Sequence, residues 1–201
     1  MSVLAAPAVF ADAVAPSRVF GKMSARTRDA VLVLAGTLLV AVFAQIRIPI
    51  QPVAITGQTL GVVLVAGALG ARRGVASLAL YALIGSLGAP VFTGFNGGWE
   101  VVTGASFGFI LGFIPAAYVV GRLAQRGWDR SLKSIAQYGL GLAIPFLVGV
   151  PWLYFALQGA GTPMSIELAL SYGLTPFIPG ELAKLAVAAV AMPVAWKAIN
   201  K

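Results

Sequence analysis

The sequence predicts an all-α integral membrane protein of about six transmembrane helices. Hydrophobic residues make up 59% of the 201 residues and charged residues only 10%, whereas a soluble domain is about 45–50% apolar and about 25% charged. A bilayer explains this excess, because its hydrocarbon core accepts apolar side chains on the protein surface. Each spanning helix needs roughly 20 residues, so residues 29–201 are expected to form one six-helix membrane domain.

Six apolar runs divide this domain. They cover residues 30–46, 55–71, 75–87, 104–123, 132–157 and 177–198. Pro49 and Pro52 follow the first run and predict a connection, because proline lacks a backbone donor and disfavours helix before it. At about 1.5 Å per residue, run 55–71 is slightly shorter than the hydrocarbon core, so it is either a short span or a re-entrant segment. The stretch 88–100 is apolar but dense in glycine, which favours a loop folded back over the protein.

The basic residues are distributed unevenly over this layout. With the N-terminus inside the cell, all but two of the 14 basic residues fall on the inner side, while Arg47 falls on the outer side and Lys184 inside the last run. This distribution follows the positive-inside rule and predicts cytoplasmic N- and C-termini. The net charge of +8 therefore predicts no nucleic-acid partner.

Residues 1–28 are expected to form an N-terminal cytoplasmic tail. Their alanine-rich start resembles a signal peptide, so a cleaved signal is the alternative, but signal peptides begin with basic residues and this segment does not. The first basic cluster comes later, at Arg18, Lys22, Arg26 and Arg28. That position is typical of the cytoplasmic flank of a first spanning helix.

The chain contains no cysteine and no histidine, which excludes several classes of function. Disulfides, Cys/His metal sites and serine–histidine or cysteine–histidine catalysis all need those residues. The Gly-x-x-x-x-Gly-Lys-Ser/Thr motif of P-loop ATPases is also missing from the sequence. A binding or transport subunit without a cofactor is therefore expected rather than an enzyme, and any ATP hydrolysis belongs to another subunit.

The last apolar run begins with two opposite charges, in the segment Pro179–Lys184. Glu181 and Lys184 are three residues apart, which puts them on one face of a helix. Ionisable side chains inside a bilayer are costly and usually serve a function. A helix N-terminus beside an ammonium group attracts anions, so the segment predicts a site for a ligand carboxylate. The alternative is an internal ion pair that only locks helix packing.

Other polar or aromatic side chains interrupt the apolar segments. Asn96 can donate and accept hydrogen bonds at once, and Trp99 is either a cavity wall or an interfacial belt residue. Thr56 is a candidate cap of the second helix, and Gln58 either faces a cavity or bonds to loop backbone. Tyr81 lies inside the third run and is either a ligand contact or a buried tyrosine with a structural partner.

Four segments, in this order, resemble the BioY family of biotin transporters. They are Ile48–Gly61, Leu69–Gly74, Gly85–Phe92 with the glycines up to Gly112, and Pro179–Lys184. The resemblance covers residues 30–198 and implies a six-helix subunit in the inner (plasma) membrane of a prokaryote that captures biotin. It also implies the partners of an energy-coupling factor (ECF) importer, which are a transmembrane coupling subunit and two ATPase subunits, besides membrane lipid.

The same resemblance implies roles for individual residues. Glu181 and Lys184 match the ligand-contacting pair of the family, which usually has aspartate at position 181, so the extra methylene changes the reach of this carboxylate. Asn96 matches the loop amide that contacts the ligand. Thr37 and Ala41 stand where such subunits often carry an Ala-x-x-x-Ala pattern for docking on the coupling subunit, and small residues at this spacing permit close helix approach.

The chemistry of biotin fits the residues named above. The vitamin combines an apolar fused ring and chain with a ureido group and a carboxylate, so its pocket needs aromatic walls, an amide and a cation. The candidates for the aromatic walls are Phe92, Phe95, Trp99 and Tyr81. The candidates for polar contacts are Asn96, Gln58 and Thr56, and the candidate cation for the carboxylate is Lys184. The sequence therefore predicts a high-affinity biotin-binding subunit. The alternatives left open are a subunit for another small carboxylate vitamin, a small membrane channel and an intramembrane enzyme.

Overall fold

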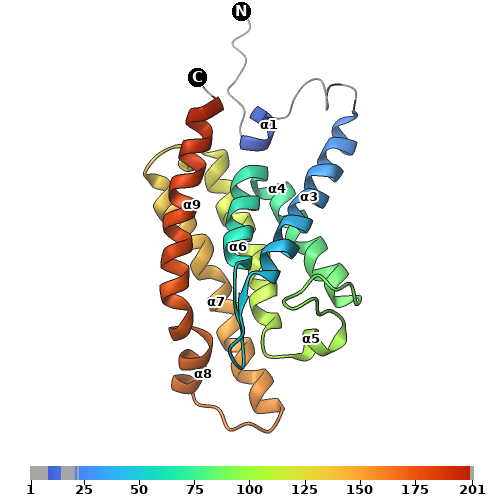
Figure 1. Cartoon of the computed structure of the whole chain (residues 1–201), viewed down its shortest axis with the longest axis vertical. Helices are drawn as coiled ribbons and strands as arrows, with labels where there is room; N and C mark the ends of the chain where they lie inside the picture. The colour runs from blue at the N-terminus through green and yellow to red at the C-terminus, as the bar shows by residue number, and fades with distance from the viewer. Residues whose placement is uncertain (1–8, 15–20, 22, 200–201) are drawn as a thin grey trace, which may run out of the picture.

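The computed structural model describes residues 9–14, 21 and 23–199, and these form an elongated helical bundle (Figure 1). A two-stranded antiparallel hairpin, β1–β2, connects α3 to α4, with Arg47 opposite Thr56 and Ile48 opposite Ile55. The 3-10 turns are η1 (Trp128–Arg130) and η2 (Thr175–Phe177). The helices and strands are α1 (Phe10–Val14), α3 (Ala25–Gln45), β1 (Arg47–Ile48), β2 (Ile55–Thr56), α4 (Gln58–Ser86), α5 (Trp99–Thr103), α6 (Phe107–Gln125), α7 (Lys133–Gly159), α8 (Ile166–Gly173) and α9 (Ile178–Ile199).

Helix α4 is a helical hairpin rather than one straight rod. Its backbone leaves helical geometry at Gly70, with φ 79° and ψ 175°. The Nε2 of Gln58 donates a hydrogen bond to the Tyr81 hydroxyl at 2.8 Å, although residues 23 positions apart in a straight helix would lie roughly 35 Å apart. The chain therefore reverses at Gly70, and the runs 55–71 and 75–87 are the two arms of this hairpin.

Five helical stretches of the described chain are long and apolar enough to cross a membrane. They are α3, α4, α6, α7 and the stretch from α8 through α9 (Ile166–Ile199). Because α4 reverses at Gly70, it contributes two of the predicted crossings. The predicted all-helical, multi-pass membrane fold with about six hydrophobic segments is confirmed.

The centre of the bundle consists of α4 and α6. In these two helices 61% and 67% of the apolar span is buried, against 22% in α3 and 17% in the α8–α9 stretch. Glycines let the central helices approach closely, since a Cβ on Gly112 would collide with the backbone of Pro145, and one on Gly121 with the backbone of Ala71. Helices α3 and α9 therefore lie at the periphery and expose apolar faces.

One end of the bundle carries both the start and the finish of the described chain (Figure 1). The ring of Phe10 in α1 packs edge-to-face on Trp196 in α9, with 5.5 Å between centroids. The carboxylate of Asp12 accepts hydrogen bonds from Arg28 at 2.8 Å and Arg73 at 2.9 Å. The two ends of the described chain thus share one side, as expected for an even number of crossings, and the positive-inside rule predicts that this side is cytoplasmic.

The predicted tail at residues 1–28 is only partly described. Residues 1–8, 15–20 and 22 lie outside the described part, together with the signal-peptide alternative. Helix α3 begins at Ala25, where the Ser24 hydroxyl accepts a hydrogen bond from the Thr27 amide at 3.1 Å. A serine N-cap of this kind satisfies one of the free amides of the first turn. The boundary at residue 28 stays a prediction.

Candidate ligand-binding site

A cavity of about 360 Å³ lies toward the end of the bundle away from α1. Its walls come from the β1–β2 hairpin, the 92–106 segment and the helices α4, α6, α7 and α9. The volume falls in the range of sites for small molecules. The polar side chains that line it are Arg47, Gln51, Thr56, Gln58, Thr59, Thr93, Asn96, Glu100, Ser106, Glu181 and Lys184, and the aromatic ones are Phe92, Phe109, Phe113, Phe146 and Phe177.

The predicted charged pair lies in the wall of this cavity. Lys184 Nζ is 2.7 Å from Glu181 Oε1 and also donates to the Thr59 hydroxyl at 3.0 Å. Thr59 in turn donates to Glu181 Oε1 at 3.0 Å. The second oxygen of Glu181, Oε2, is buried and has no hydrogen-bond partner among the described residues. The pair is neutral as a whole and leaves one carboxylate oxygen as an unused hydrogen-bond acceptor.

The local sequence explains why Glu181 and Lys184 project into the bundle near the start of α9. Helix α9 begins at Ile178 directly after η2, with Pro179 in its first turn, where a missing amide costs no helical hydrogen bond. Glu181 and Lys184 then fall on the same face, one turn inside the helix. Their side chains are each only 13% exposed, so they are largely shielded from lipid.

Gln58 is a hydrogen-bonding centre in the cavity wall. Its Oε1 accepts from the hydroxyls of Thr56 at 2.8 Å and Thr93 at 3.1 Å, and its Nε2 donates to Tyr81. Tyr81 is fully buried, donates to the Val91 carbonyl at 3.2 Å and does not line the cavity. Of the two alternatives for Gln58, the structure therefore favours the one that faces the cavity, and Tyr81 supports it from behind.

Thr56 does not cap the second helix. The N-cap position of α4 is Gly57, which provides no side-chain cap. The Thr56 hydroxyl instead bonds to the side chain of Gln58 and accepts from the Gln58 amide at 3.3 Å. Thr56 belongs to strand β2, opposite Arg47, so its position is set by the hairpin and not by the helix.

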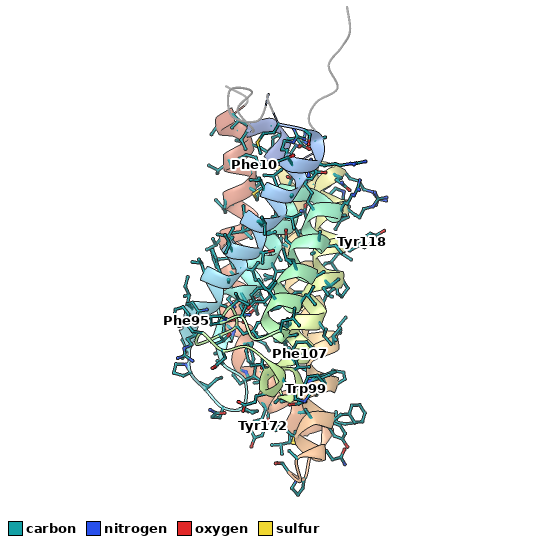
Figure 2. All side chains as sticks on the ribbon, turned by 90° about the vertical axis from the view of Figure 1, so that its right-hand side faces the viewer. Phe10, Phe95, Trp99, Phe107, Tyr118 and Tyr172 are labelled. Atoms are coloured by element: carbon teal, nitrogen blue, oxygen red, sulfur yellow. The ribbon has the colours of Figure 1, made fainter. Side chains whose placement is uncertain are left out.

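The glycine-rich segment folds back over the bundle, and its residues have different surroundings. Phe92 is buried and lines the cavity, and Asn96 lines it while its Nδ2 donates to the Thr93 carbonyl at 3.0 Å. Phe95 is 70% exposed and lies at the edge of the molecule (Figure 2). Trp99, at the start of α5, is 74% exposed. Neither of these two exposed side chains lines the cavity.

Several cavity residues were not expected from the sequence. Arg47 lines the cavity, and its guanidinium packs against Gly94, but it forms no ion pair with any described residue. Arg47 is the one basic residue that the sequence places on the outer side, and this unusual position could have predicted a functional role. Phe109, Phe146 and Phe177 pack on one another and supply the aromatic wall expected of Trp99 and Phe95. They lie in or beside uniformly apolar runs, where no pattern distinguishes an inward-facing ring.

Of the two residues in the expected docking pattern, Thr37 faces inward and Ala41 is partly buried. Thr37 is 1% exposed, and its hydroxyl donates to the carbonyls of Val33 at 3.0 Å and Ser77 at 2.9 Å. A Cβ on the neighbouring Gly36 would collide with the Ser77 hydroxyl. Thr37 and Gly36 therefore serve the packing of α3 on α4.

Comparison with known proteins agrees with this architecture. The family model described as the BioY family matches residues 17–201. A biotin transporter BioY from Thermotoga maritima is 38% identical over 154 residues, which cover 77% of this chain and 87% of that protein. A probable biotin transporter BioY from Pyrococcus horikoshii is 33% identical over 165 residues, covering 82% and 94%.

A biotin transporter BioY from Rhizobium etli is 33% identical, with 82% of this chain and 90% of that protein covered. The crystal structure of an S-component for biotin from an ECF-type ABC transporter superimposes with a TM-score of 0.73. It covers 87% of this chain and 95% of that chain at 24% identity, and so supports the fold. Taken with the six-segment bundle and its outer cavity, these matches mean that the chain belongs to the BioY family.

Proposed function

We propose that this protein is the biotin-binding membrane subunit of an ECF-type importer. The observation that carries the proposal is the aromatic-walled cavity, which combines the Glu181–Lys184–Thr59 group with Arg47 in a member of the BioY family. Relatives are named biotin transporters, and the similar solved structure is an S-component for biotin. These names give no support to the channel or to the intramembrane enzyme.

The two ends of biotin suit two different parts of the cavity. A ureido group has two N–H donors and a carbonyl acceptor, and the neutral Glu181–Lys184 pair offers the complementary acceptor Oε2 and donor Nζ. The charge of Lys184 is already offset by Glu181, whereas Arg47 has no ion pair among the described residues. We therefore assign the carboxylate to Arg47 rather than to Lys184, in contrast to the expectation from sequence.

The remaining cavity residues orient the bicyclic ring and the chain. Phe92, Phe109, Phe146 and Phe177 supply apolar surface, which gains from excluding water around the ring and methylenes. Asn96 and Thr93 present polar groups at the rim, held by the 92–96 turn. Gln58 and Tyr81 fix this arrangement before the ligand arrives, which lowers the ordering cost of binding.

Uptake driven by ATP requires partners. The chain has no P-loop motif, so we assign ATP hydrolysis to two ATPase subunits, joined through a transmembrane coupling subunit in the inner membrane. Because Thr37 is buried against α4, docking uses the exposed apolar faces of the peripheral helices. Co-purification of the tagged chain with the three expected subunits tests this part.

Biotin and its neutral amide, biotinamide, separate the two ends of the site. Titration of the purified Arg47→Gln variant should show an affinity for biotin about 10- to 100-fold lower than that of the wild type, which corresponds to the loss of a charge-assisted hydrogen bond. Its affinity for biotinamide should change little. Lys184→Ala should weaken both ligands, because the ureido group is common to them. If Lys184→Ala weakens biotin alone, Lys184 binds the carboxylate and the expectation from sequence is restored. Absence of biotin binding by the folded wild type contradicts the proposed function.

A further inference from the structure

Gln45 is the last residue of α3 and uses every hydrogen-bonding position of its side chain. Its Nε2 donates to the carbonyls of Ala41 and Phe92, both at 3.1 Å. Its Oε1 accepts from the amides of Gly94 and Phe95, also both at 3.1 Å. A glutamine amide has two donor hydrogens and two acceptor lone pairs, so this side chain is fully satisfied, and three of its four bonds go to residues 92–95.

The turn that Gln45 holds has an unfavourable backbone. The Phe92 amide donates to the Asn96 carbonyl at 2.9 Å, which closes a five-residue turn over residues 92–96. Gly94 and Phe95 inside it both have positive φ, 75° and 58°. A left-handed conformation is disfavoured for a bulky residue such as phenylalanine. Such a turn persists only where its surroundings fix it, and the Gln45 side chain is the group that meets its inward amides.

This turn supplies part of the ligand cavity, but Gln45 does not line it. Phe92, Thr93 and Asn96 all face the cavity. Gln45 lies behind them, at the end of a helix whose apolar span is only 22% buried. It thereby ties a peripheral membrane helix to the cavity wall through hydrogen bonds to backbone atoms.

We propose that Gln45 is a positioning residue that holds the 92–96 turn in its ligand-binding conformation and so slows ligand release. The inference deepens the proposed function and rests on it for the identity of the ligand. Only a side chain of this length with both a donor and an acceptor can make these bonds. A carboxylate at position 45 keeps the acceptors for Gly94 and Phe95 but loses the donor to Phe92, and a methionine of similar shape loses both.

The test uses the full chain in detergent with Gln45→Met, Gln45→Glu and the control Gln158→Met. Gln158 is an exposed glutamine near the end of α7 whose side chain bonds to no described residue. The first measurement is the rate of hydrogen exchange at the amides of residues 93–96 without ligand. The second is the rate at which labelled biotin dissociates after a chase with unlabelled biotin. Melting temperatures establish that each variant folds.

Gln45→Met should exchange the 93–96 amides faster and release biotin on the order of 10- to 100-fold faster, since three hydrogen bonds to the turn are lost. The association rate should stay within about threefold, because most interface changes act on dissociation. Gln45→Glu should approach wild type as the pH is lowered through about 4.3, the usual pKa of a glutamate side chain, because only the protonated carboxyl regains one donor. Gln158→Met should behave as wild type throughout.

Wild-type exchange and wild-type dissociation in Gln45→Met would overturn the proposal. Should Gln45→Met fail to fold, Gln45→Glu decides, because a purely structural role predicts no pH-dependent recovery of the dissociation rate relative to wild type. If the wild type itself does not bind biotin, the proposed function fails, while the exchange rates without ligand still decide whether Gln45 holds the turn.

Discussion

At the residue scale, the cavity depends on side chains that reach the ligand and on others that support them. Glu181 and Lys184 are costly to place in a membrane, and their ion pair, together with the hydrogen bonds of both side chains to the Thr59 hydroxyl, offsets part of that cost. Tyr81 never reaches the cavity, yet it joins Gln58 to the Val91 carbonyl. Gln58 therefore forms one hydrogen-bonded network with Tyr81, Thr56 and Thr93, in which the loss of a supporting hydroxyl leaves buried groups unpaired.

Tyr81→Phe tests this support. The substitution leaves Gln58 Nε2 and the Val91 carbonyl without their tyrosine partner, so the free energy of unfolding should fall by about 1–3 kcal/mol. Thermal and denaturant unfolding of the purified protein measure the change. Tyr118→Phe is the control, because Tyr118 is 55% exposed and its hydroxyl bonds to no described residue. Equal stability of the two variants would show that the Tyr81 hydroxyl contributes nothing.

Some of the cavity residues could be predicted from the sequence and others could not. The difference lies in whether a residue contrasts in polarity with its neighbours in the chain. Lys184, Glu181 and Gln58 are polar side chains in apolar runs. The free-energy cost of placing them in a membrane was enough to predict a functional role, and all three line the cavity. Phe146 and Phe177 stand in or beside apolar surroundings, so only tertiary packing distinguishes them from rings that face lipid. Trp99 and Phe95 are aromatic residues close to Asn96 in the sequence, which predicted them as cavity walls, but the turn and α5 direct both outward.

At the element scale, the reversal at Gly70 divides α4 into two membrane-crossing arms. Gly70 has φ 79° and ψ 175°, a combination that essentially only glycine adopts. A Cβ there would also lie 2.9 Å from Val9 and 3.1 Å from Gln125. The tight reversal brings Gln58 against Tyr81 and so places the polar wall of the cavity.

Gly70→Ala should destabilise this hairpin by about 1–3 kcal/mol, because it forces a side chain into a strained backbone conformation. Gly159→Ala is the matched control, since a Cβ at Gly159 meets nothing within 4 Å and its φ is ordinary. Melting temperatures in the same detergent provide the comparison. A Gly70→Ala variant as stable as Gly159→Ala would mean that the reversal does not depend on glycine.

Long elements were predictable because apolar length is a strong signal, and short ones were not. The runs anticipated all the long helices, and α7 continues through Pro145 and Pro151 as tolerated in a membrane. Helices α1, α5 and α8 span five, five and eight residues, too few for a periodic pattern to establish. The start of α8 had a readable signal in Ser165, whose hydroxyl caps the Leu168 amide.

At the scale of the whole molecule, the two ends of the bundle have different roles. The end with α1 holds the ion pairs of Asp12 and Asp29 with Arg28 and Arg73. The β1–β2 hairpin and α5, which contribute to the cavity wall, lie away from that end (Figure 1). Helix α3 runs between the two ends and reaches the 92–96 turn through Gln45.

The central claim is that biotin occupies the outer cavity. It is tested most directly by calorimetric titration of biotin into the folded wild type, Ala105→Trp and Ala160→Trp. Ala105 lines the cavity, whereas Ala160 is exposed beyond the end of α7. We predict one biotin per chain for the wild type and for Ala160→Trp, and no binding by Ala105→Trp, because the indole fills the space. Wild-type affinity in a folded Ala105→Trp, or no binding by the wild type, would contradict the account.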